Sequence, residues 1–213
     1  MLRVFLRARP RMTQRLGQTE AFELPPSKKL IVPRGHTSWW GVDPSTLRVA
    51  IATVSVDHGG PGSAPRRRSK IKAFDDSRPV VQRLPEIREE TYRLAQTVSM
   101  TFAEKPGVIV VEKPAGFGDR PNPELAYAAG ATLCGLVEFA RGSGLKVLLI
   151  EGARWKKVAC GRGDIKKPKP RSGVEYPVLT WARTVGFTGS SWDEADAWGI
   201  AEYARRTYAL DQR

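Results

Sequence analysis

The hydrophobic pattern becomes regular near residue 38 and is strand-like at first. Residues 38–42 and 48–56 are predicted to form two strands joined by an Asp-Pro-Ser-Thr turn, and the second of them alternates with a period of two. A third strand is predicted at 70–74, at an edge of the sheet. Residues 57–69 are rich in Gly, Pro and Ser and are predicted to form a loop. The sheet therefore starts with antiparallel strands.

Helical spacing alternates with fully apolar strands in the rest of the chain. Apolar residues at 84–104 fall on one face of a helix that Pro106 and Gly107 end. The wholly apolar stretches 107–112 and 145–150 predict buried strands. Further helices are predicted at 122–141, from about 176, and at 193–210. The order predicts an α/β fold, a mixed sheet with an antiparallel start and a parallel continuation, flanked by helices.

Residues 1–40 carry eight Lys and Arg against two Glu and show no sustained period. They predict a basic, disordered N-terminal tail in front of one domain at 41–213. Three interpretations stay open for it. Residues 1–11 are Arg-rich and free of acids, as in a transit peptide; translation could start at Met12; or the tail could be a basic arm that binds nucleic acid.

The charge of the whole chain points to a polyanionic partner. Its 213 residues include 35 Lys and Arg against 22 Asp and Glu, a formal net charge of +13. A strongly basic domain gains affinity for nucleic acid by displacing counterions from phosphate. Two cysteines and two histidines are too few for a disulfide scaffold or a His-rich zinc site. The uncharged stretch 125–137 is shorter than the roughly 20 residues that span a bilayer, so we expect a soluble intracellular protein with no membrane partner.

Basic residues gather in two stretches that are both predicted to be loops. We predict that they bind nucleic acid, with a solvated charge run as the alternative for each cluster. Lys113, which directly follows an acidic strand end, is assigned the same role. The residues concerned are Arg66, Arg67 and Arg68 in the first cluster, and Lys166, Lys167 and Arg171 in the second.

Four acidic residues stand where an unpaired carboxylate is costly. Asp43 ends the first strand at a tight turn, and Glu112 ends the apolar strand 107–112. Asp193 and Asp196 are three residues apart at the start of the last helix, and hence on one helix face. Parallel strands present ligand-binding groups at their carboxyl ends. If the two strands are neighbours and the last helix crosses them, all four carboxylates converge.

An all-oxygen cluster suits hard divalent cations, so the predicted cofactor is Mg²⁺, with Mn²⁺ able to substitute. Two such ions about 4 Å apart can promote in-line hydrolysis of a phosphodiester without a nucleophilic side chain. The competing interpretation is structural. Asp43 would cap its own turn, Asp193 would cap the helix, and Asp196 would favour the helix dipole.

Three blocks resemble, in order and spacing, the signature of the RuvC-type Holliday-junction resolvases of the RNase H-like superfamily. They are Gly41-Val-Asp-Pro-Ser45, Val110-Val-Glu-Lys-Pro114 and Asp193-Glu-Ala-Asp-Ala197. Asn122-Pro-Glu-Leu-Ala126 is similar to the family's helix after the second acid. The stretch 155–167 is similar to its segment of lysines around Gly-x-Gly. The resemblance covers about residues 39–210.

The resemblance implies an RNase H-like nuclease domain and Mg²⁺- or Mn²⁺-dependent nicking of a four-way DNA junction by a homodimer. It implies that the helix after Pro123 forms the dimer contact, and that the protein works in the cytoplasm of a bacterium or a phage-infected cell. It places the catalytic, metal-binding acids at Asp43, Glu112, Asp193 and Asp196, and phosphate-facing lysines at Lys156 and Lys167.

The sequence departs from the family pattern in several places. Ala115 stands where the resolvases usually have an aromatic residue, and Phe117 follows two positions later. Pro168 and Pro170 interrupt the helix that should follow the lysines. Such divergence is more typical of the phage-encoded branch, which often accepts other branched DNA.

Two other functions stay open. The stretch 41–52 also resembles the start of a YqgF-like RNA-processing nuclease, and a ribonuclease H is a related possibility. Glu112 argues against the YqgF-like interpretation, because that family does not usually have Glu at this position. Four-way DNA and an RNA–DNA hybrid, compared as substrates, separate these activities. The third possibility is a non-catalytic nucleic-acid-binding module, which would keep the fold without binding Mg²⁺.

Overall fold

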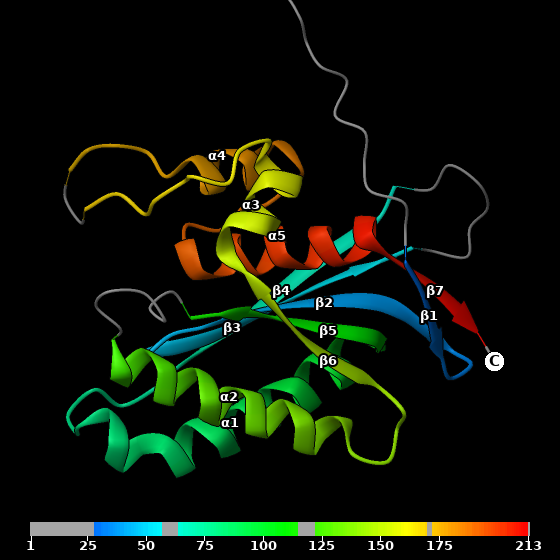
Figure 1. Ribbon diagram of the computed structural model, residues 1–213, viewed down its shortest axis with the longest axis horizontal. Coiled ribbons are helices and arrows are strands. Elements are labelled where there is room, and N and C mark those ends of the chain that lie inside the picture. Colours follow the sequence, from blue (N-terminus) through cyan, green and yellow to red (C-terminus); the bar gives the residue numbers. More distant parts are fainter. Residues whose placement is uncertain (1–27, 57–63, 115–121, 170–171, 213) are drawn as a thin grey trace, which may run out of the picture.

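The computed structural model describes residues 28–56, 64–114, 122–169 and 172–212. Its main sheet has five strands in the order β4-β3-β2-β5-β6 (Figure 1). β3 is antiparallel to both of its neighbours, β2 and β4, and β5 and β6 continue the sheet parallel to β2. This confirms the predicted mixed sheet. The strands are β2 (His36–Pro44), β3 (Arg48–Ser55), β4 (Arg66–Ala73), β5 (Lys105–Lys113) and β6 (Lys146–Glu151).

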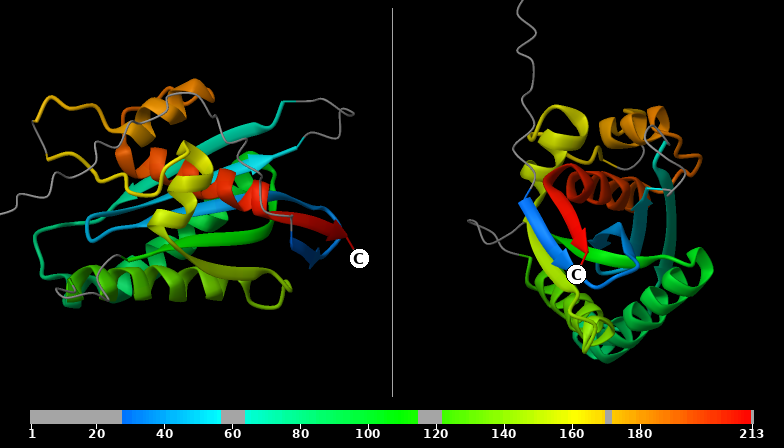
Figure 2. Two further views of the ribbon diagram at one scale, coloured as in Figure 1. Left: turned by 45° about the horizontal axis from the view of Figure 1, so that its top comes forward. Right: turned by 90° about the vertical axis from the view of Figure 1, so that its right-hand side faces the viewer.

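Helices cover both faces of this sheet (Figures 1 and 2). One face packs against α1 (Val80–Phe102) and α2 (Pro123–Ala140). The other packs against α3 (Gly152–Cys160), α4 (Pro177–Thr184) and α5 (Trp192–Thr207). β3 is consequently buried on both faces from Val49 to Ser55, so its alternating pattern does not mark a solvent face. In the described part of the chain, no helix has the length and apolar composition needed to cross a bilayer.

A second, two-stranded sheet lies at one end of the molecule. β1 (Lys28–Val32) pairs in parallel with β7 (Tyr208–Gln212), and the Trp39 indole donates a hydrogen bond to the Tyr208 carbonyl at 2.7 Å. Residues 28–37, assigned to the tail from the sequence, thus form β1 and the start of β2. The partner strand of β1 lies 180 residues away along the chain, because Lys28 pairs with Tyr208, so local periodicity could not reveal it. Residues 1–27 lie outside the described part.

Three further elements differ from the prediction. β4 begins at Arg66 and pairs with β3 along its whole length, so Arg66, Arg67 and Arg68 belong to a strand and not to a loop. The last helix ends at Thr207, where β7 begins. Helix α3 had no counterpart in the sequence analysis. The second helix agrees closely, since Asn122 caps it by accepting hydrogen bonds from the Glu124 and Leu125 amides.

Candidate metal centre and its cationic surroundings

Three of the four predicted acids meet at one edge of the sheet. Asp43 lies near the end of β2 and Glu112 near the end of β5, on neighbouring parallel strands in which Val42 pairs with Val111. Asp196 comes from α5, which packs across β2. One carboxylate oxygen from each of the three lies within 4.8 Å of the others. Two strand ends and one helix therefore build a compact oxygen cluster.

Gly41 sets the distance between α5 and β2. A Cβ added there would lie 2.3 Å from both the Ala197 carbonyl oxygen and the Ala201 amide nitrogen. Only a residue without a side chain lets the helix backbone approach the strand this closely. The approach brings Asp196, one residue before Ala197, to the level of Asp43.

Asp196 is held from a third element. The Tyr176 hydroxyl, at the start of α4, donates a hydrogen bond of 2.7 Å to Asp196 Oδ1. Both residues are buried. Burial raises the pKa of Asp196 above its ordinary value, against the charge of Lys167 and the hydrogen bonds from Lys167 and Tyr176. Tyr176 thus fixes which oxygen of Asp196 faces the cluster.

Asp193 lies one helical turn earlier, at the margin of the cluster. It is not the helix cap, because the Ser191 side chain accepts the capping hydrogen bond from the Glu194 amide. Asp193 instead pairs with Arg48 at 3.3 Å and with Lys167 at 3.0 Å. The three-carboxylate cluster at 4.8 Å does not include it.

Lys167 reaches into the same place. Its ammonium lies 2.8 Å from Asp196 Oδ2, 3.0 Å from Asp193 Oδ1 and 3.4 Å from Asp43 Oδ2. Burial opposes its charge, but the charges of Asp43, Asp196 and Asp193 prevail and raise the pKa of Lys167 above its ordinary value. The lysine therefore stays protonated and links Asp193 to the cluster.

Glu112 has a different environment. A Cβ added to Gly152, the first residue of α3, would lie only 2.4 Å from Glu112 Oε1. The glycine therefore leaves the space that the carboxylate fills. Burial, followed by the charge of Asp196, raises the pKa of Glu112 to about 7, while the charge of Lys156 acts in the opposite direction. Burial likewise raises the pKa of Asp43 well above its ordinary value.

These donors fit a hard divalent cation. Carboxylate oxygens from three separate elements lie close enough to share one ion. Buried carboxylates crowded together repel one another, and a bound cation relieves both that repulsion and the cost of burial. Residues of this chain that could hold Mg²⁺ or Mn²⁺ are Asp43, Glu112 and Asp196, with Asp193 beside them.

The residues of the first predicted basic cluster point alternately to the two faces of the sheet, because successive side chains of a strand lie on opposite faces. Arg67 points toward α5 and pairs at 3.2 Å with Glu202, a fully buried carboxylate that also holds Arg205 and Arg206. Arg68 points to the other face, where it donates to the Phe102 carbonyl and lies over the Phe102 ring. Arg67 and Arg68 are thus engaged within the fold. Arg66 begins the strand and is exposed.

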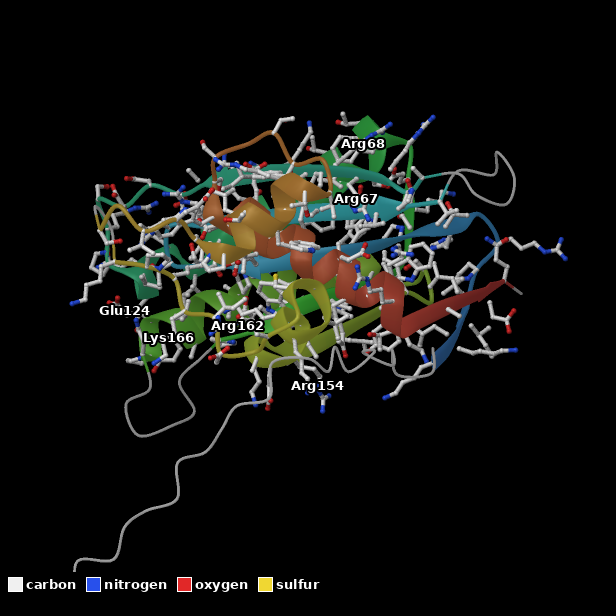
Figure 3. All side chains as sticks on the ribbon, turned by 90° about the horizontal axis from the view of Figure 1, so that it is seen from above. Arg67, Arg68, Glu124, Arg154, Arg162 and Lys166 are labelled. Carbon is white, nitrogen blue, oxygen red and sulfur yellow. The ribbon has the colours of Figure 1, made fainter. Side chains whose placement is uncertain are left out.

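The second basic cluster lies on the opposite side of α5 (Figure 3). There the exposed residue Lys166 shares one side of the molecule with Arg154 of α3 and with Arg162, which pairs with Asp164. Lys156 lies over the Trp155 ring near Glu112, and Lys113 follows Glu112 at the end of β5. Arg171 lies outside the described residues.

Sequence reasoning missed several residues that position the site. Arg48 and Tyr176 hold Asp193 and Asp196, and Gly41 and Gly152 make room for their neighbours. A tyrosine or glycine carries no local signal of such a role. Only Gly41 lay within a motif that the sequence analysis had singled out.

No protein-family model matches the sequence, and no curated protein matches it significantly. Solved structures do match. The RuvC structure of Thermus thermophilus is 20% identical with a TM-score of 0.56, over 79% of this chain and 93% of that one. The same bacterium's RuvC in complex with a Holliday junction substrate is 22% identical with a TM-score of 0.55, over 79% and 92%. The chain therefore has a RuvC-like fold, as its sequence resemblance predicted.

Proposed function

We propose that this chain is a metal-dependent endonuclease that resolves branched DNA, four-way junctions above all, by hydrolysing phosphodiester bonds. The observation that carries the proposal is the cluster of Asp43, Glu112 and Asp196 oxygens within 4.8 Å, at the strand ends of a RuvC-like fold. A structure similar to this chain was solved with a Holliday junction, which favours branched DNA as the substrate.

In this proposal, Asp43, Glu112 and Asp196 hold Mg²⁺ or Mn²⁺, and Asp193 completes the set. The bound ions supply activation of the attacking water and stabilisation of the leaving 3′ oxygen. Tyr176 orients Asp196, and Gly152 leaves space for Glu112. Lys156, near Glu112, is suited to orient the phosphate beside the cluster.

The proposed nucleic-acid face follows from the same geometry. Lys113 directly follows Glu112 at the end of β5, and Lys166 directly precedes Lys167, so both lie beside the acidic edge; Lys166 also shares one side of the molecule with Arg154 (Figure 3). Basic side chains around an acidic centre attract the DNA backbone while the metal neutralises the carboxylates. We assign Arg67 and Arg68 a smaller part, because both already have partners in the fold.

A homodimer belongs to the proposal. The outward side of α2 carries Tyr127, Cys134 and Val137 at spacings of seven and three, hence on one helix face, which we call the α2 ridge. The exposed fractions of Tyr127 and Val137 are 52% and 51%. A groove of about 470 Å³ runs beside it, lined by Leu133, Cys134 and Val137 together with charged residues. A two-fold dimer would match the two-fold symmetry of a junction.

Cleavage of a synthetic four-way junction, with and without Mg²⁺, tests the proposal. We expect the wild type to nick the junction only with metal, and Asp43→Asn to lose at least about 10³ of the rate, the scale for removing a catalytic group. Junction binding in a gel shift should persist. The matched control is Asp76→Asn, an exposed carboxylate between β4 and α1, which should cut normally.

Other results would reject the proposal. Full cleavage by Asp43→Asn would show that the reaction does not depend on the carboxylate cluster. Cleavage of an RNA–DNA hybrid but not of the junction would favour a ribonuclease. DNA binding without any cleavage or metal binding would favour a non-catalytic module.

A further inference from the structure

The four carboxylates form two overlapping groups. Asp43, Glu112 and Asp196 make the compact cluster. Asp43, Asp193 and Asp196 make a second group, whose common partner is the Lys167 ammonium at 2.8 to 3.4 Å. In the described part of the chain, Glu112 is not among the ion-pair partners of Lys167. The Lys167 ammonium thus lies on the Asp193 side of the cluster, and on the other side Glu112 forms no ion pair with it, although the charges of Lys156 and Lys167 both act on Glu112.

Lys167 can leave this position without unfolding the domain. It lies between α3 and α4 in a stretch without regular secondary structure, and 40% of its side chain is exposed. Asp43 and Asp196, by contrast, are almost fully buried on a strand and a helix. The carboxylates are therefore fixed and the ammonium is the movable partner.

We propose that Lys167 is a built-in occupant of a second cation position. In the metal-free protein its ammonium neutralises Asp43, Asp193 and Asp196. A second divalent ion that binds there displaces Lys167, which becomes free to pair with DNA phosphate. The inference rests on the metal site of the proposed function and adds to it an order of events, in which the first ion binds beside Glu112 and the second competes with a lysine.

Competition has a measurable consequence. A divalent ion must break the ion pairs between Lys167 and the carboxylates before it can bind these carboxylates itself. The lysine therefore lowers the affinity for the second ion. Removal of the ammonium should remove that cost. Since a cation about 3 Å from carboxylates interacts strongly in a partly buried site, we expect an effect of about tenfold or more on the second dissociation constant.

Calorimetric titration of the full chain with Mn²⁺, in the absence of DNA, tests the inference. We expect the wild type to bind one ion tightly and a second weakly, and Lys167→Met to bind the second at least about tenfold more tightly. Lys167→Arg keeps a cation and should resemble the wild type. Lys169→Met removes the same charge from an exposed position in the same loop and should also resemble it.

Thermal unfolding separates competition from a purely structural role. In chelator, Lys167→Met should melt at a lower temperature than the wild type, because three carboxylates lose their counter-charge. Mn²⁺ should abolish this difference in melting temperature. A lysine that only stabilised the fold would lower the melting temperature without tightening Mn²⁺ binding. Wild-type or weaker Mn²⁺ affinity in Lys167→Met would therefore overturn the inference.

A measurement on the wild type covers the case in which Lys167→Met does not fold. Amine acylation followed by mass spectrometry should modify Lys167 slowly without metal and faster, relative to Lys169, at saturating Mn²⁺. An unchanged ratio would overturn the inference.

None of these assays contains DNA. A chain that exchanges Lys167 for Mn²⁺ but cuts no junction would refute the proposed function alone, and a junction nuclease with no such exchange would refute this inference alone.

Discussion

Glu112 illustrates how much the surroundings of a single residue decide. Glu112 and the next residue, Lys113, are both partly buried at the end of β5, but the Glu112 carboxylate is packed against Gly152 and lies within reach of the charges of Asp196, Lys156 and Lys167. Burial is the main reason that its pKa rises to about 7. A carboxylate that takes up a proton near neutral pH is a sensitive reporter of whether a cation occupies the site.

The stability of the metal-free protein should therefore depend on pH through Glu112. The folded state holds the proton more tightly than the unfolded state, whose Glu pKa is about 4.5. This contribution is fully present below pH 4.5 and is lost as the pH rises through about 7. We expect the melting temperature of the wild type in chelator to fall between pH 5 and 8 relative to that of Glu112→Gln, as checked by circular dichroism.

Metal should reverse the trend at the upper end of this range, because binding requires the ionised carboxylate. Mn²⁺ should thus raise the wild-type melting temperature more at pH 8 than at pH 6, and by much less in Glu112→Gln. Parallel melting curves for the two proteins in chelator would show that Glu112 titrates normally.

At the scale of elements, the approach of α3 to the end of β5 shapes the site. The helix was not predicted, because its nine residues are short and follow the strand β6 directly. Its first residue, Gly152, leaves room for Glu112. The contact joins elements 40 residues apart, and each looks ordinary on its own.

Gly152→Ala should separate metal binding from stability. The new Cβ would lie 2.4 Å from Glu112 Oε1, so the carboxylate must move out of the cluster. We expect Mn²⁺ affinity to fall by about tenfold or more, measured by calorimetry. The free energy of unfolding should change by less than about 1 kcal/mol, because alanine favours a helix.

The control is Gly130→Ala in α2, where an added Cβ meets nothing within 4 Å; its Mn²⁺ affinity should equal that of the wild type. If Gly152→Ala binds Mn²⁺ normally, Glu112 either tolerates the displacement or is not a ligand.

At the scale of the whole molecule, the charge of +13 is distributed by the fold and not by the sequence alone. Arg67 and Arg68 stabilise the packing of β4 against α5 and α1, while Lys166 and Arg154 lie on the far side of α5 (Figure 3). Of the second set, Lys166 adjoins Lys167, which contacts the acidic edge. The α2 ridge lies on the opposite face of the sheet from α5 (Figure 1).

The proposed dimer should depend on the α2 ridge. A charge in the middle of a helix–helix contact is costly to bury, so Val137→Arg should convert the dimer into a monomer in size-exclusion chromatography with light scattering. Val81→Arg introduces the same charge at a valine of α1 that is 59% exposed, and it should stay dimeric. A wild type that is monomeric at micromolar concentration would show that there is no stable dimer. A dimeric Val137→Arg would show that the dimer interface lies outside the α2 ridge.

The sequence by itself determined the order of the main elements and the mixed sheet. It also put Asp43 and Glu112 at strand ends and Asp193 and Asp196 on one helix face. These features depend on neighbours within a few residues, which periodicity, turn residues and helix caps report directly. The RuvC-like fold followed from the same local blocks, and the catalytic roles of the four acids stay a prediction.

Only the tertiary structure decided the features that join distant parts of the chain. β1 pairs with β7, the basic strand β4 divides its arginines between two faces, and Lys167 inserts among acids from β2 and α5. Gly41 and Gly152 acquire their importance in the same way, from backbone and carboxylate atoms that approach them from other elements. The physical reason is that burial and charge pairing depend on where atoms lie in space. When two residues are far apart in sequence, the residues around each of them do not indicate that the two will be in contact.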